Sequence, residues 1–341
     1  MWVTWSKKVP DTGFSPIRRR YLLMLALLSM ATALTLAACG GGGEKSAPQP
    51  VVTPTATPTP TIEPIIVASD LAVGPNRFVV GLVDPTRNEL VIDARLHLRL
   101  FKLESQAGTA TLKAVVDARP LTVQRSYTHI HEDGKLENHE AGTVGVYVAQ
   151  LEFDSPGTWG VEITGTQKDG QPLPRLVPAF TVQERSRSVP LGAPAPSTVQ
   201  LVLSDVKDIS EIDTSNPPNP DMHSMTVADA VKSGTPTVIV FATPSFCVSR
   251  TCGPVKETVD QLYGKYKGRA NFVHIEPYDL AKVQSGQGLV PVPAMAEWGL
   301  QSEPWVFMVD EGGTVAVKFE GIVGFDELEA ALTSLLATPR S

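Results

Sequence analysis

The stretch VIVFATPSFCVSRTCGPVKETVDQL, residues 238–262, carries the strongest structural signal in the chain. It follows Thr237 and opens on a run of apolar, mostly β-branched residues, which predicts a buried strand. A helix-compatible segment follows the second of two cysteines, and Pro254 is tolerated there only in the first helical turn. Because Cys247 and Cys252 lie between strand and helix, the stretch predicts a corner that carries two thiols.

The segments on either side of this corner, from residue 189 to 341, predict alternating strands and helices. The order is strand, helix, strand, helix and then a hairpin followed by a last helix, which favours an α/β layer fold. We expect, beyond the corner itself, a helix at 225–231, a strand at 270–275, a helical piece at 294–298, strands at 305–309 and 314–319, and an amphipathic helix at 325–336.

This part of the sequence resembles the thioredoxin-like superfamily. Residues 238–262 are similar to the family's segment of strand, active-site cysteines and helix, and residues 303–310 are similar to its later strand, which a cis-proline opens. The resemblance covers residues 189–341, and it implies an α/β thioredoxin-like fold with Pro304 in the cis form beside the two cysteines. Pro304 would then line a groove and align the backbone of a substrate.

The spacing of the cysteines departs from the family pattern. Four residues separate Cys247 from Cys252, whereas the family has two. If Phe246-Cys247 is aligned with the family's Trp-Cys, Cys247 is the nucleophile. If Cys252 and the Gly-Pro that follows it are aligned with the family's Cys-Gly-Pro, Cys252 is the nucleophile. Free N–H groups at a helix N-terminus stabilise a thiolate, which slightly favours Cys252. Arg250 could assist either sulfur, and Ile239 stands where the family has a buried acid, so that proton relay is not expected.

The N-terminal 38 residues predict an export signal. Three arginines at positions 18–20 precede residues 21–38, which contain no charge; a basic region followed by an apolar one is typical of such signals. The run ends in Leu-Ala-Ala and then Cys39, which resembles the bacterial lipoprotein signal peptide. The resemblance implies that Cys39 is lipidated and that the protein is anchored at the extracytoplasmic face of the cell membrane.

Composition limits the remaining classes. The chain has 341 residues, 42% of them apolar, and this predicts two domains with buried cores. Its formal charge is −7, and because the first 38 residues contribute +4, the rest is at −11. So acidic a chain is not expected to bind nucleic acid. Residues 39–64 are rich in Gly, Pro and Thr and predict an extended tether.

Residues 65–185 predict a β domain. Short alternating apolar runs are separated by turn residues, without helical segments, which favours an immunoglobulin-like sandwich. The expected fold class is therefore two domains, an all-β immunoglobulin-like sandwich at 65–185 followed by an α/β thioredoxin-like fold at 189–341.

A histidine-rich hairpin is expected within the β domain. His129 and His131 are two residues apart, so they share one face of a strand. His139 joins that face if a three-residue loop at 133–135 pairs position 129 with 139. The commoner two-residue Asp-Gly turn pairs 129 with 138 and turns His139 away. Three imidazoles on one face could hold copper or zinc, and a solvated hairpin is the alternative.

The cysteines indicate redox chemistry. Two thiols five positions apart in an exported protein predict a disulfide, since they meet an oxidising compartment. A structural disulfide is one interpretation. The resemblance instead implies thiol–disulfide exchange on the thiols or disulfides of exported proteins, through a mixed disulfide. The candidate catalytic residues are then Cys247, Cys252 and Pro304, and no cofactor is expected.

Two other functions stay open. Sco-type copper chaperones share the thioredoxin fold and use two cysteines with a distant histidine, and here His223 or His274 could be the third ligand. The third possibility is a non-catalytic extracytoplasmic binding protein whose disulfide is structural. The sequence does not decide the direction of electron flow, the substrate or the electron donor.

Overall fold

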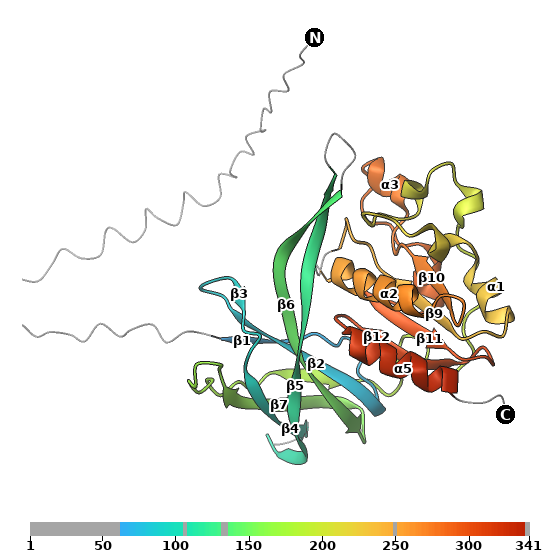
Figure 1. Ribbon diagram of the computed structural model, residues 1–341. Coiled ribbons are helices and arrows are strands. Elements are labelled where there is room, and N and C mark those ends of the chain that lie inside the picture. The colour runs from blue at the N-terminus through green and yellow to red at the C-terminus, as the bar shows by residue number, and fades with distance from the viewer. Residues whose placement is uncertain (1–61, 105–107, 131–135, 248–250, 338–341) are drawn as a thin grey trace, which may run out of the picture. The chain divides into compact units, whose positions relative to one another are not determined.

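The computed structural model describes residues 62–104, 108–130, 136–247 and 251–337 (Figure 1). Strand is the main secondary structure of the described residues, at 39% against 21% helix. Two sheets are present in the described residues, one of eight strands and one of four, and both belong to a single compact unit, Pro58–Ser341.

The eight-stranded sheet is built from antiparallel pairs in the order β1-β2-β6-β5-β4-β7-β8, with β3 paired to β2. A parallel bridge between Ala72, just before β2, and Gln183, just after β8, nearly closes it into a barrel. Its core contains the buried rings of Trp159, Tyr147 and Phe78. The strands are β1 (Glu63–Ile66), β2 (Gly74–Asp84), β3 (Glu89–Leu90), β4 (Arg95–Leu103), β5 (Ala110–Ile130), β6 (Leu136–Phe153), β7 (Gly157–Thr166) and β8 (Ala179–Val182).

The expected immunoglobulin-like sandwich is wrong. A sandwich consists of two packed sheets, whereas here one continuous path of hydrogen-bonded strands connects β1 to β8. The long strands β5 and β6 prevent a division, because β5 pairs with both β4 and β6, and β6 also pairs with β2. Alternation of apolar residues predicts which face of a strand is buried, but it does not predict where a sheet ends.

The register of the β5–β6 hairpin also differs from both expected registers. His129 pairs with Glu137, and His139 pairs with Tyr127. Ile130 pairs with Leu136, so the connection is longer than the two or three residues considered. His131 lies outside the described residues, and the metal-binding hypothesis for this hairpin stays a prediction.

The four-stranded sheet has the order β10-β9-β11-β12, in which β9 and β10 are parallel and the other pairs are antiparallel. Helices α2 and α5 pack together against one face, with Val238 and Val240 beneath them. Its strands are β9 (Thr237–Phe241), β10 (Asn271–Ile275), β11 (Trp305–Val309) and β12 (Val315–Glu320). Its helices are α1 (Val227–Lys232), α2 (Cys252–Tyr266), α3 (Leu280–Gln284), α4 (Pro293–Glu297) and α5 (Phe325–Ala337).

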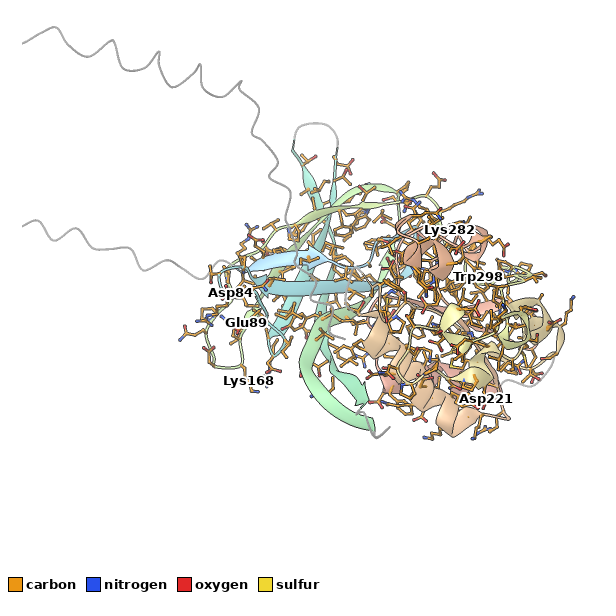
Figure 2. The ribbon with its side chains drawn as sticks, turned by 90° about the horizontal axis from the view of Figure 1, so that it is seen from above. Asp84, Glu89, Lys168, Asp221, Lys282 and Trp298 are labelled. Carbon is orange, nitrogen blue, oxygen red and sulfur yellow. The ribbon has the colours of Figure 1, made fainter. Side chains whose placement is uncertain are left out.

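The opposite face of this sheet is covered by α1 and α4. The side chain of Trp298 lies there (Figure 2). Its fully buried ring packs against Phe307, with centroids 4.6 Å apart, and near Phe241. Its indole N–H donates to Thr198 Oγ1 at 2.9 Å, so the one polar atom of the ring is satisfied. Aromatic packing of this kind contributes beyond the area that it buries.

The expected α/β thioredoxin-like class is likewise contradicted. The individual strands and helices predicted after residue 225 lie within a few residues of their expected positions. However, strand exceeds helix overall, and α1, α3 and α4 span only five or six residues each. Residues 203–223 contain only short 3₁₀ turns, η2 (Leu203–Asp205), η3 (Ile209–Glu211) and η4 (Pro220–His223). Prolines at 217, 218 and 220 remove the backbone donors that an α-helix needs there.

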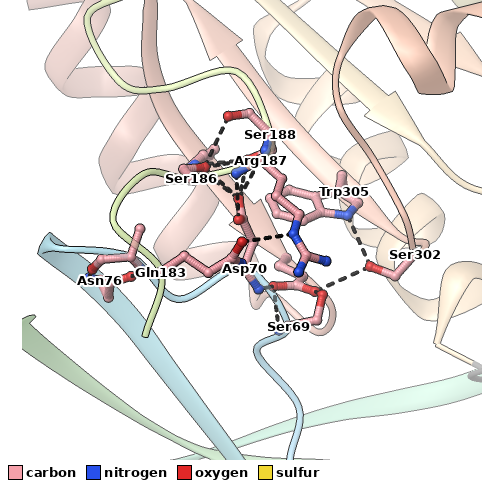
Figure 3. A network of polar contacts seen from close by, with 12 residues as sticks. Ser69, Asp70, Asn76, Gln183, Ser186, Arg187, Ser188, Ser302 and Trp305 are labelled. Carbon is pink, nitrogen blue, oxygen red and sulfur yellow. Dashed lines mark hydrogen bonds and ion pairs between the residues drawn. The ribbon is translucent and has the colours of Figure 1, made fainter. Parts of the chain in front are cut away.

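A carboxylate network ties the two sheets together (Figure 3). Asp70, which precedes β2, accepts hydrogen bonds from the Ser188 hydroxyl at 2.6 Å, from the Arg187 N–H at 2.8 Å, and from the Ser186 hydroxyl. Lys318 of β12 lies 3.5 Å from the same carboxylate. Burial alone would raise the pKa of Asp70, but these hydrogen bonds and the Lys318 charge hold it below its usual value.

We expect Asp70→Asn to lower the free energy of unfolding by about 1–3 kcal/mol at pH 7, because the donors that surround Asp70 lose a charged acceptor. A lowered pKa in the folded state stabilises the protein above the unfolded value of about 3.9, and this stabilisation is lost as the pH falls through the folded pKa. The difference in free energy of unfolding between Asp70→Asn and the parent chain should therefore be smaller at pH 3 than at pH 7. Urea unfolding at both pH values measures it, with exposed Asp169→Asn as control. An equal deficit at both pH values contradicts the assignment.

Candidate functional site

The strand registers bring three chain segments to one edge of the four-stranded sheet. Phe241 ends β9 and pairs with Ile275, the last residue of β10, and with Trp305, the first residue of β11. Chain leaving β9 and chain entering β11 therefore lie next to each other. The first segment leads to Cys247, and the second carries Glu303, two positions before the first residue of β11.

The two cysteines meet where α2 begins. Cys252 is the first residue of α2 and is fully buried, whereas Cys247 is half-buried. The backbone N–H of Cys252 donates to Cys247 Sγ at 3.2 Å. The structure forms no disulfide between these two cysteines, so the expected disulfide stays a prediction. Both sulfurs and a carboxylate oxygen of Glu303 lie within 4.8 Å of one another.

The surroundings of the two sulfurs distinguish their acidity. The neighbouring Cys247 sulfur raises the pKa of the Cys252 thiol, and burial raises it further. Cys247 instead accepts an N–H at the N-terminus of a helix of 15 residues, where negative charge is stabilised. These contacts favour Cys247 as the nucleophile and Cys252 as the resolving thiol, which reverses the slight preference for Cys252 expected from the sequence.

The Glu303–Pro304 peptide bond is cis, as predicted. Glu303 was not among the predicted site residues, although its place directly before the expected cis-proline could have identified it. Tyr278 donates its hydroxyl to Glu303 Oε2 at 2.9 Å. Burial and the Glu303 carboxylate raise the pKa of Tyr278, so the phenol stays protonated and keeps donating. Ile239 is buried in β9, and Glu303 places a carboxylate beside the sulfurs from the segment that leads into β11.

The two histidines considered as copper ligands form a different cluster. His223 of η4 and His274 of β10 are buried with Asp213, and their ligand atoms lie within 4.8 Å of one another. Within the described parts of the chain, no histidine is grouped at that distance with Cys247 and Cys252. The hydrogen bonds of both imidazoles outweigh burial and lower the pKa of Asp213, while burial lowers the pKa of His223.

Comparison with known proteins gives no relative. No family model, curated protein or solved structure matches the chain. Cys39 and the segment that contains Arg250 lie outside the described residues. Of the helices that the structure describes, none combines the length and the apolar composition needed to cross a membrane.

We expect iodoacetamide to modify Cys247 at least tenfold faster than Cys252 in the reduced, folded chain at pH 7. Alkylation requires an accessible thiolate, which burial and a raised pKa deny to Cys252. Peptide mass spectrometry over a time course measures both rates, and the unfolded chain, in which the two rates should converge, is the control. Faster labelling of Cys252 contradicts the assignment.

Proposed function

We propose that this protein is a thiol–disulfide exchange protein that acts on exported proteins and is anchored by lipid at Cys39 on the extracytoplasmic face of the cell membrane. One observation carries the proposal: the half-exposed Cys247 sulfur accepts the first N–H of α2, beside a second, buried thiol. The proposal rests on this pair of cysteines and on the resemblance of the surrounding sequence to membrane-attached thiol–disulfide proteins. It does not require that the chain share the fold class of those proteins.

The chemistry follows from the two environments. The Cys247 thiolate attacks one sulfur of a substrate disulfide, forms a mixed disulfide and releases the other substrate sulfur as a thiolate. Cys252 then loses its proton and attacks Cys247 Sγ, which releases the second substrate thiolate. The products are a reduced substrate and a Cys247–Cys252 disulfide. The reverse sequence oxidises a substrate dithiol and returns both cysteines to thiols.

Glu303 supports the second half of this sequence. Cys252 has a raised pKa, so its attack requires a base that takes the thiol proton. A Glu303 carboxylate oxygen lies within 4.8 Å of both sulfurs, and the Tyr278 hydroxyl donates a hydrogen bond to Oε2 of that carboxylate. Glu303 therefore accepts the Cys252 proton as the mixed disulfide is resolved, and cis-Pro304 aligns the substrate backbone beside it.

Copper delivery is a second candidate, because two thiols and a carboxylate converge at ligand distance. Soft thiolates select Cu(I), which two sulfurs can bind. Copper transfer does not form a covalent bond to a protein substrate, so trapping of mixed disulfides separates the two functions.

We expect full-length Cys252→Ala to accumulate mixed disulfides with exported proteins in cells, because the resolving thiol is missing. Cys247→Ala should accumulate none, and the double variant is the matched control. Non-reducing electrophoresis, with the adducts released by dithiothreitol, measures the result. Trapping by Cys247→Ala alone would assign the attack to Cys252. If neither single variant traps a partner, exchange is excluded and a structural or copper-binding pair stands.

A further inference from the structure

Three ligand atoms converge in the buried cluster of Asp213, His223 and His274. His223 Nε2 lies 3.0 Å from Asp213 Oδ2 and 3.2 Å from His274 Nδ1, and the third side, from His274 Nδ1 to Asp213 Oδ2, is 3.5 Å. A tetrahedral Zn²⁺ with bonds of about 2.0–2.1 Å keeps its ligand atoms about 3.3–3.4 Å apart. The triangle thus has the size of one face of a zinc coordination tetrahedron.

Contacts outside the triangle orient two of its three groups, His274 and Asp213. His274 Nε2 lies 2.9 Å from the carbonyl oxygen of Ala242, which can only accept, so Nε2 carries the proton and Nδ1 has the lone pair. Asp213 is held by the backbone N–H groups of Ser215, at 2.8 Å, and Asn219, at 3.3 Å. A backbone carbonyl on the second ring nitrogen is the usual support of a metal-binding histidine.

Hydrogen bonding alone leaves this triangle incomplete. With both imidazoles neutral, the proton on His223 Nε2 can point to Asp213 or to His274, but it serves one of them at a time. The lone pairs of His274 Nδ1 and Asp213 Oδ2 then face each other at 3.5 Å. A cation at the centre contacts all three atoms favourably.

The cluster borders a cavity of about 510 Å³, which His223, His274 and Glu276 help to line. Glu276 is 5% exposed, and its Oε2 has no hydrogen-bond partner in the described part of the chain, while Thr214 binds Oε1. The nearby buried ammonium of Lys256 is paired with Asp260 at 2.8 Å. An added divalent cation is thus attracted by two buried carboxyl groups, Asp213 and Glu276. The charge of Lys256, which would repel it, is already compensated by Asp260.

We propose that Asp213, His223 and His274 bind one Zn²⁺, with the fourth coordination position open to the cavity. Two imidazoles and a carboxylate are the ligand set of open zinc sites, which hold water or a small ligand at the fourth position. The unpartnered Oε2 of Glu276 is an acceptor for a zinc-bound water. This site is separate from Cys247 and Cys252, and the inference does not depend on the exchange function.

Zinc binding to the full-length chain carrying Cys39→Ser, Cys247→Ser and Cys252→Ser tests the proposal, since no thiolate can then contribute. Competition with a chromophoric chelator should give one bound Zn²⁺ per chain. In this background, Asp213→Asn and His274→Gln should each weaken zinc binding at least 100-fold. His129→Ala with His131→Ala, in the predicted hairpin site, and Glu303→Gln, in the cysteine cluster, are matched controls that should leave zinc affinity unchanged.

A second readout avoids reliance on variants of buried residues. Co²⁺ is added to the same cysteine-substituted chain, in which Asp213, His223 and His274 are unchanged. It should give the intense visible bands of a four- or five-coordinate ion, without a thiolate-to-cobalt charge-transfer band. Only the weak spectrum of hexaaqua Co²⁺, absence of zinc binding, or a zinc affinity that Asp213→Asn and His274→Gln leave unchanged would each overturn the proposal.

Discussion

Two central strands without an exposed residue constrain the four-stranded sheet. Every residue of β9 and β11 is buried, and α2 and α5 cover one face while α1 and α4 cover the other. A polar or ionisable side chain in the middle of such strands would be desolvated on both faces. Chemistry is therefore confined to the ends of the strands, and the registers place the ends of β9 and β10 and the start of β11 at one edge.

Both functional clusters lie at this edge and share one segment of backbone. Ala242, the first residue after β9, accepts the Nε2–H of His274 through its carbonyl oxygen. The same segment continues to Cys247, whose sulfur accepts the first N–H of α2. The orientation of His274 and the placement of the thiols thus depend on the same strand end.

The local features of the site were predictable because they are local in sequence. Residues 238–262 predicted the buried strand, the helix after the cysteines and the corner between them, and the context of Pro304 predicted its cis peptide bond. The difference between the two sulfur environments was not predictable in this way. Which sulfur is buried depends on the packing of α2 against the sheet, and the helix begins at Cys252 itself, so its first free N–H serves the other cysteine.

Features that depend on distant pairing were missed. Strand patterns predicted β structure in residues 65–185, but the pairing of β5 with two neighbours makes one sheet where two were expected. His223 and His274 were identified as candidate ligands with the wrong partners. Their partner Asp213 comes from a proline-interrupted segment without periodicity, and only the folded chain brings it to β10.

The reduction potential of the Cys247–Cys252 pair in the full-length protein tests the central claim most directly. The N–H of Cys252 and the N-terminus of α2 stabilise a Cys247 thiolate, and hence the reduced form of the pair. Structural disulfides of exported proteins lie below about −300 mV, whereas catalytic ones are more oxidising. Equilibration with glutathione buffers should give a potential above that value. A potential below it, with a bond that glutathione does not reduce in the folded protein, would contradict exchange and leave the cysteines as a structural pair.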